Sequence, residues 1–181
     1  PQPHDVTANG NAHLIGPKIG TSAIHFDGSG DYLSAPAAAG ILGSSDFTVE
    51  GWYNITAKDT GGTALMAGGE GGSAGWMVEW WGDDMYFYWH NGSSTQSPSW
   101  SWTPTYNRWY HIAVARSGDL LDLWIDGVSQ GTQAMSGTVA DGSDWTLGVQ
   151  PGSSNYDLKG YAGPQRISDV ARYTVGSDFT P

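Results

Sequence analysis

The sequence has 181 residues, with 10 tryptophans, 9 tyrosines, 27 glycines and no cysteine, and its formal net charge at pH 7 is −11. So many aromatic residues, with only 14% charged residues, indicate a globular protein of one domain rather than a disordered chain. The negative charge excludes nucleic-acid backbones as partners, and the lack of cysteine excludes disulfides, thiolate metal sites and cysteine nucleophiles. No apolar run is long enough to insert into a membrane.

Short runs of alternating apolar and polar residues, separated by glycine-rich turns, predict β-strands along the whole chain. We interpret residues 1–181 as a single domain, in which residues 1–22 form an edge strand or an arm. The strands are predicted, in chain order, at residues 23–27, 31–35, 47–55, 63–67, 75–81, 84–90, 109–116, 119–126, 128–134, 144–150 and 158–166. Helix is predicted only as a single turn over 168–173, with Ser168 as its N-cap.

About ten short strands with regularly spaced turns predict an all-β fold, a two-sheet antiparallel sandwich or jelly roll. The turn residues between 109–116 and 119–126 predict that these two strands pair as a hairpin. Because the chain begins at Pro1, without a signal peptide, we expect it to be a processed product or an excised domain.

Four segments carry a resemblance to a known family. Residues 23–33 read AIHFDGSGDYL, residues 46–52 read DFTVEGW, residues 108–128 form the predicted hairpin with WYHIAVAR and IDGV, and residues 160–181 end in ARYTVGSDFTP. In this order they resemble laminin-G-like domains of the concanavalin A-like lectin and glucanase superfamily, of the type seen in bacterial surface proteins and phage structural proteins. The resemblance implies a jelly roll with an extracellular, cell-surface or virion-surface location.

The superfamily includes glycoside hydrolases, and the resemblance implies that a glucanase of this fold would carry its acids as alternating residues of one strand. Alternation would point all the carboxyl groups into one cleft. The sequence contains no such pattern; the nearest approach, from Glu79 to Asp84, is divided by a predicted turn. The motifs of serine hydrolases, zinc proteases and phosphate loops are also missing, so we predict that the protein is not an enzyme.

Aromatic residues beside predicted turns are the candidates for carbohydrate binding, because an exposed ring can stack on a sugar. They are Trp80, Trp81, Trp89, Trp100, Trp102 and Tyr106. Trp100 and Trp102 have the same parity, so we expect both to present one face of an extended segment. Two alternatives remain open for each ring: packing into a satellite cluster, or contact with another protein.

A structural calcium ion is what the resemblance implies, and an acidic chain suits it. The candidate ligands are Asp27, Asp31, Asp83, Asp84, Asp141 and Asp169. For Asp27, Asp31 and Asp126, capping of a glycine turn is the favoured interpretation.

These observations favour a non-catalytic carbohydrate-binding or adhesion module of a secreted, cell-surface or virion-surface assembly. Its partner would then be a glycan or a surface protein. The alternative is a structural or decoration domain of a virion or appendage that contacts other subunits. A glucanase that has lost or relocated its acids is a third and more distant hypothesis.

Overall fold

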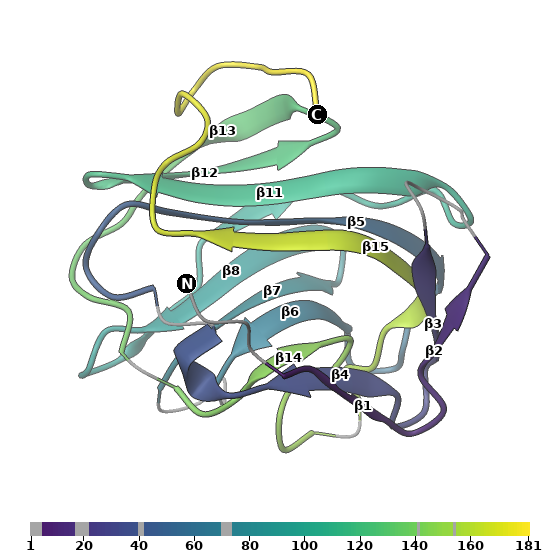
Figure 1. Ribbon diagram of the computed structural model, residues 1–181. Coiled ribbons are helices and arrows are strands. Elements are labelled where there is room, and N and C mark those ends of the chain that lie inside the picture. The colour runs from purple at the N-terminus through teal and green to yellow at the C-terminus, as the bar shows by residue number, and fades with distance from the viewer. Residues whose placement is uncertain (1–4, 17–21, 40–41, 70–73, 141, 154) are drawn as a thin grey trace.

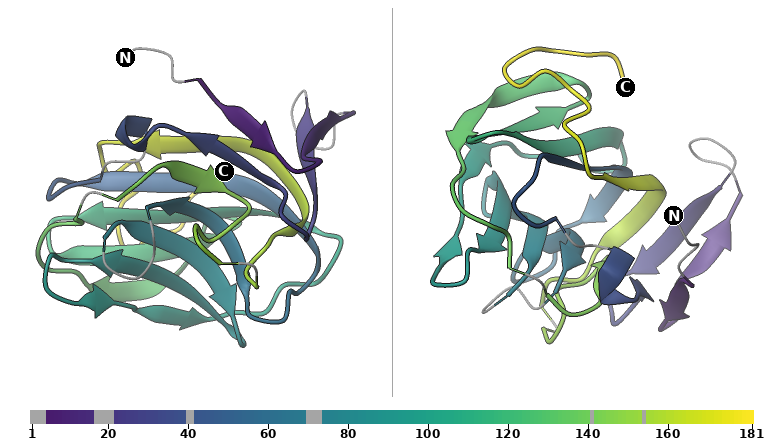
Figure 2. Two further views of the ribbon diagram at one scale, coloured as in Figure 1. Left: turned by 90° about the horizontal axis from the view of Figure 1, so that it is seen from below. Right: turned by 60° about the vertical axis from the view of Figure 1, so that its left-hand side comes forward.

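The protein folds into two antiparallel β-sheets packed face to face, as the sequence predicts (Figure 1, Figure 2). The computed structural model describes residues 5–16, 22–39, 42–69, 74–140, 142–153 and 155–181. Sheet A has the order β1 (Thr7–Asn9), β4 (Tyr32–Ala35), β14 (Trp145–Leu147), β6 (Thr63–Gly68), β7 (Trp76–Trp81), β8 (Asp84–His90) and β10 (Ser99–Ser101), with β9 (Thr95–Gln96) also paired to β8. Sheet B has the order β13 (Val128–Ala134), β12 (Leu120–Ile125), β11 (Trp109–Ser117), β5 (Phe47–Ala57), β15 (Lys159–Ser168), β3 (Ala23–Asp27) and β2 (His13–Ile15).

The N-terminal residues supply an edge strand to each sheet. Strand β1 pairs with β4 at one edge of sheet A, and β2 pairs with β3 at one edge of sheet B. Within the described ranges, the only helix is the short 3-10 helix η1 (Ala37–Ala39). The same ranges contain no helix that is long and apolar enough to cross a membrane.

The alternation of side chains along the strands builds the core between the two sheets. In β8, Met85, Phe87 and Trp89 are buried, whereas the residues between them are partly exposed on the outer face of sheet A. The predicted hairpin is confirmed, since β11 and β12 pair in register from Ile112 opposite Ile125 to Ser117 opposite Leu120.

The C-terminal segment, residues 169–181, crosses the outer face of sheet B above β11 and β12 (Figure 1). The rings of Tyr173 and Phe179 stack 3.6 Å apart and cover Trp124. The indole nitrogen of Trp124 donates a hydrogen bond to the carbonyl of Ser177 at 2.8 Å. The helical turn predicted over 168–173 is therefore wrong. Ser168 is the last residue of β15, and the chain beyond it forms bends and a turn at Val175 and Gly176, while Tyr173 and Phe179 pack on the sheet.

Glu50, in β5, anchors this segment to the sheet. Its carboxylate lies 3.1 Å from Nε2 of His111 and 2.5 Å from Nε of Arg166, and the hydroxyl of Tyr173 donates to it as well. Arg172 adds an ion pair at 3.3 Å. Burial alone would raise the pKa of Glu50, but the hydrogen bonds from His111, Tyr173 and Arg166 outweigh it and lower the pKa to about 2.

We expect Glu50→Gln to lower the free energy of unfolding by about 2–4 kcal/mol, because charged hydrogen bonds to a buried group are lost. Since the folded pKa lies below the ordinary value of 4.5, the stabilisation is complete above pH 4.5 and disappears as the pH falls towards 2. Urea titrations at pH 7 and pH 3 measure both effects. Asp119→Asn, at an exposed turn, is the matched control, and a variant as stable as the parent would refute the role of Glu50.

Candidate functional site

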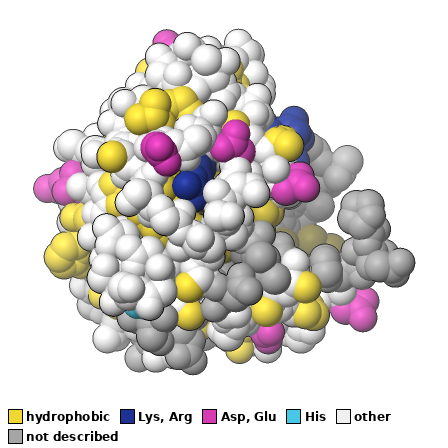
Figure 3. All heavy atoms as spheres, turned by 90° about the vertical axis from the view of Figure 1, so that its left-hand side faces the viewer, with side chains coloured by type: hydrophobic (Ala, Val, Ile, Leu, Met, Phe, Trp, Pro, Cys, Tyr) yellow, Lys and Arg dark blue, Asp and Glu magenta, His cyan; other side chains and the backbone are white. Residues whose placement is uncertain are grey.

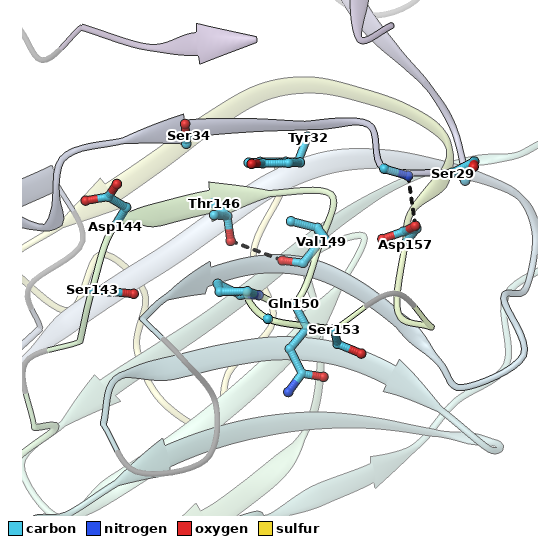
Figure 4. Close-up of a pocket in the computed structure, with 14 residues that line it drawn as sticks. Ser29, Tyr32, Ser34, Ser143, Asp144, Thr146, Val149, Gln150, Ser153 and Asp157 are labelled. Atoms are coloured by element: carbon cyan, nitrogen blue, oxygen red, sulfur yellow. Dashed lines mark hydrogen bonds between the residues drawn. The ribbon is translucent and has the colours of Figure 1, made fainter. Parts of the chain in front are cut away.

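A cleft of about 800 Å³ opens on the outer face of sheet A, at β4 and β14 (Figure 4). It is lined by Gly28, Ser29, Gly30, Tyr32, Ser34, Ser143, Asp144, Thr146, Val149, Gln150, Pro151, Gly152, Ser153 and Asp157. Residues from two distant parts of the sequence, 28–34 and 143–157, therefore meet in one concave surface, which is the usual form of a small-ligand site.

Strand alternation turns the polar side chains of β4 and β14 into the cleft. Leu33 and Leu147 pack with the core, so Tyr32, Ser34 and Thr146 face outwards. Thr146 lies opposite Ser34 in the ladder, so both residues lie on the floor of the cleft, where the Ser34 hydroxyl accepts a hydrogen bond from the Asn9 side chain at 3.2 Å.

The loop after β14 forms the opposite wall, and three features hold it there. Gly148 has a φ of 93°, and a side chain at this position would come within 2.8 Å of the buried ring of Phe26. The hydroxyl of Thr146 donates to the carbonyl of Val149 at 3.1 Å. The backbone N–H of Gly30 donates to Oδ2 of Asp157 at 3.0 Å, which ties the β3–β4 turn to the loop (Figure 4).

The cleft is lined by polar side chains and by one aromatic ring, that of Tyr32. Four serine hydroxyls, the Gln150 amide and two carboxylates surround the partly exposed ring of Tyr32. Hydroxyls and amides both donate and accept hydrogen bonds, and a tyrosine ring offers an apolar face. None of these residues is among the binding candidates predicted from the sequence, although Ser29 and Tyr32 belong to the segment 23–33 that carries the family resemblance. The outward parity of Tyr32 and Ser34 in a predicted strand is the signal that could have indicated them.

Most of the predicted aromatic site residues are in the core instead. Trp80, Trp89 and Trp100 are 2%, 3% and 4% exposed, so these three expectations are wrong. Trp100 lies opposite Met85 on the inner face of β10, and its indole nitrogen donates to the carbonyl of Gly131 at 2.6 Å. Trp102 is partly buried and meets Tyr110 edge to face at 5.0 Å, so the two rings do not form an open platform.

Trp81 and Tyr106 are the exposed members of that set, at 48% and 44%. Trp81 continues into an aromatic strip on the outer face of β7 and β8, which we define as Trp81, Tyr86 and Tyr88. Tyr86 lies 5.9 Å from Trp81 and stacks on Tyr88 at 5.2 Å. Tyr106 instead packs edge-on against buried Trp80.

Glu79 lies under the outer face of sheet A and is only 2% exposed. A side chain on Gly62 would come within 2.3 Å of its Oε1, which has no hydrogen-bond partner. Burial raises the pKa of Glu79 to about 7, and the nearby charge of Lys58 and the hydrogen bond with Tyr88 offset only part of this effect. Because it is covered by the chain, this carboxyl group does not reach a ligand in the cleft.

The candidate calcium ligands are not gathered by the fold. Asp31 accepts backbone hydrogen bonds from Asn11 at 2.5 Å and from Asp27 at 2.9 Å, while Asp27 accepts one from Ser29 at 2.8 Å. These carboxylates cap turns, as the glycine pattern favours. Asp83 lies in the β7–β8 turn, Asp84 is the first residue of β8, Asp169 follows β15, and Asp141 lies outside the described residues. Among the described residues, no group of three or more aspartate, glutamate or histidine side chains is placed to hold a metal ion.

A smaller hollow of about 290 Å³ lies on the outer face of sheet B, where β15 bulges at Gly163 and Pro164. It is lined by Trp52, Gln165 and three members of the Glu50 cluster, namely Glu50, His111 and Arg166. We define this cluster as Glu50 and the four side chains that contact its carboxylate: His111, Arg166, Arg172 and Tyr173. Its charged groups already hold the C-terminal segment, and Gln165 donates to the carbonyl of Gly163 at 3.1 Å.

A laminin G family model, described as the concanavalin A-like lectin/glucanases superfamily, matches residues 27–174. The chain belongs to this superfamily. The match contains the cleft, the aromatic strip and the Glu50 cluster.

Solved structures with the same fold include two that are described as complexes with sugars. Domain 4 of AbnA, a GH43 extracellular arabinanase from Geobacillus stearothermophilus, in complex with arabinotriose, is 19% identical with a TM-score of 0.68, over 93% of this chain and 82% of that one. The botulinum neurotoxin serotype D binding domain is 17% identical with a TM-score of 0.71, and the same domain with N-acetylneuraminic acid is 15% identical with a TM-score of 0.72. This chain is covered over 92% in both toxin comparisons but spans only 43% of the toxin chains. No curated protein matches the sequence.

Trp100→Ala should lower the free energy of unfolding by about 3–5 kcal/mol, because it leaves a cavity in the core and removes the hydrogen bond to Gly131. Trp81→Ala, an equal truncation at an exposed ring, should cost less than about 1 kcal/mol. Chemical denaturation of the two variants gives the comparison, and equal losses would contradict the assignment of Trp100 to the core.

Glu79 should make stability fall as the pH rises. Below pH 4.5 the group is protonated in both states; between pH 4.5 and about 7 only the unfolded chain releases the proton, which costs about 1.4 kcal/mol per pH unit. Glu79→Gln should remove this slope and stabilise the protein by about 1–3 kcal/mol at pH 7.5, with little change at pH 4. Denaturation of Glu79→Gln and of the control Asp84→Asn across this range tests it, and an unchanged slope in Glu79→Gln would refute the assignment.

Proposed function

We propose that this protein is a non-catalytic carbohydrate-binding module whose ligand occupies the cleft on sheet A. The observation that carries the proposal is the lining itself: hydroxyl, amide and carboxylate groups around the partly exposed ring of Tyr32. Sugars present both hydrogen-bonding hydroxyls and apolar C–H faces, so this combination complements them.

The similar structures support the same reading. The arabinanase domain holds arabinotriose, and one structure of the toxin domain holds N-acetylneuraminic acid. The arabinanase is also named as extracellular, which favours an extracellular place for this module. Within an extracellular location, the module could belong to a cell-surface assembly or to a virion-surface assembly, and we propose these as the two alternatives.

The absence of catalysis is part of the proposal, and the placement of the acids supports it. Figure 4 shows Asp144 and Asp157 at opposite ends of the cleft. A glycosidase places two carboxyl groups on either side of one glycosidic bond. Glu79 is covered by the chain and takes no part in the cleft.

The aromatic strip favours a second candidate function, a contact with another protein in a surface or virion assembly. Tryptophan and tyrosine are the preferred anchors of protein interfaces, and Trp81 is 48% exposed. In that case the domain would serve decoration or subunit contact rather than recognition of a glycan.

Tyr32→Ala should weaken carbohydrate binding by at least about tenfold, since the apolar face for the sugar is lost. Tyr32→Phe keeps the ring and should retain most of the affinity. Affinity electrophoresis in gels containing arabinan, β-glucan or galactan measures the retention, and Trp81→Ala is the control at an exposed ring outside the cleft.

Equal retention of Tyr32→Ala and the parent protein would place the ligand elsewhere. If no polysaccharide retards the protein, and light scattering shows an oligomer that Trp81→Ala dissociates, the second candidate function is correct.

A further inference from the structure

We infer that the cleft selects uncharged sugars over anionic ones, with the free carboxylate oxygen of Asp157 accepting a hydrogen bond from a sugar hydroxyl. The inference rests on the proposed function and names its ligand class. Uronates, sialic acids and sulfated sugars are the excluded class.

Asp157 supplies an unused acceptor in the cleft. The residue is 4% exposed, and its Oδ2 is held by the N–H of Gly30 at 3.0 Å, which fixes the direction of the carboxylate. Its own backbone N–H donates to Asp59 at 3.2 Å. Oδ1 is buried and has no partner. An unpaired buried acceptor is costly, so a ligand donor at this position gains the full value of a charge-assisted hydrogen bond.

The charge of the cleft is negative at both ends. Asp144 is exposed at one end and Asp157 lies at the other (Figure 4). Among the described residues that line the cleft there is no lysine, arginine or histidine. A carboxylate on the ligand would therefore meet like charges without a cation to pair with it, which disfavours binding strongly.

The described basic side chains are engaged elsewhere. Arg108 pairs with Asp126, Arg116 donates to the carbonyls of Gly118 and Gly137, and Lys58 donates to the carbonyl of Gly82. Arg166 and Arg172 pair with Glu50 on the other sheet. The carbon chain of Lys159 lies against Gly28, a residue of the lining, but Lys159 itself is not part of the lining. Acidic side chains are also spread over the face drawn in Figure 3, with few basic ones between them.

The remaining lining groups suit a neutral ligand. Ser34, Gln150 and Ser153 donate and accept without a net charge, and the ring of Tyr32 stacks on any pyranose or furanose face. Of the two sugars seen in similar structures, arabinotriose is neutral and N-acetylneuraminic acid is an acid. The chemistry of this cleft matches the neutral class.

The test compares neutral and anionic probes by isothermal titration calorimetry at 20 mM and 300 mM NaCl. The neutral probes are arabinotriose and maltotetraose; the anionic probes are N-acetylneuraminic acid and maltotetraose oxidised to carboxylates at its primary hydroxyls. At low salt we expect the anionic probes to bind at least tenfold more weakly. The difference in affinity between neutral and anionic probes should become smaller at high salt, because salt screens the repulsion between carboxylates. If the oxidised probe bound weakly only because its primary hydroxyls are gone, salt would not change the difference.

Two variants, with a third as a control, test whether the selectivity arises from the two aspartates of the cleft. Asp144→Lys should improve binding of the oxidised probe at least fivefold, while Asp119→Lys, with the same change in net charge on the hairpin turn of sheet B, should not. Asp157→Asn should weaken the neutral probes at least tenfold; its melting temperature shows whether it folds, and the Asp144→Lys result stands independently if it does not.

Anionic probes that bind the parent protein as tightly as neutral ones would overturn the inference and leave the proposed function intact. Loss of binding in EDTA, restored by CaCl₂, would assign Asp157 to a cation and overturn the direct hydrogen bond. No binding of any probe, or of any polysaccharide in the gels, would overturn the proposed function itself.

Discussion

Glu50 lies beneath the C-terminal segment and contacts the side chains that hold this segment on sheet B. Two of them, Arg172 and Tyr173, belong to the segment, and Arg166 belongs to the strand before it. With the carboxylate in place, Tyr173 and Phe179 cover Trp124, which would otherwise expose a large ring on the outer face. One buried acid thus helps to keep the outer face of β11 and β12 covered, whereas the cleft on the outer face of sheet A is open.

The cleft depends on the same two-residue period that builds the core. The hydroxyl side chains of β4 and β14 face outwards because their neighbours in sequence, such as Leu33 and Leu147, pack between the sheets. This alternation accounts for the side chains on the floor of the cleft, but it does not account for the wall of the cleft. The wall comes from the loop after β14, which turns at Gly148 and is tied to the β3–β4 turn through Asp157 and Gly30. A polar ligand site therefore results from a strand pattern combined with one contact between residues 127 positions apart.

The strand pattern made the two sheets, the hairpin of β11 and β12 and the turn-capping aspartates predictable from the sequence. The binding residues were less accessible, for two physical reasons. Strand β7 reads WMVEWW, with large apolar residues at both parities, so alternation cannot tell that Trp80 faces the core and Trp81 faces solvent. Trp100 was misassigned because its strand pairs with β8 only at the sheet edge, a contact without a local signal. Asp157 and Gln150 lie outside regular strands, where only the folded chain determines their direction.

Mapping of backbone amide chemical shifts during titration with maltotetraose or arabinotriose tests the central claim most directly. The account predicts that the largest changes occur at residues 28–34, 143–153 and Asp157, with little change at Glu50, Trp52 or residues 169–181. Shifts centred on the hollow at Trp52 and Gln165, or on the aromatic strip with none in the cleft, would contradict it.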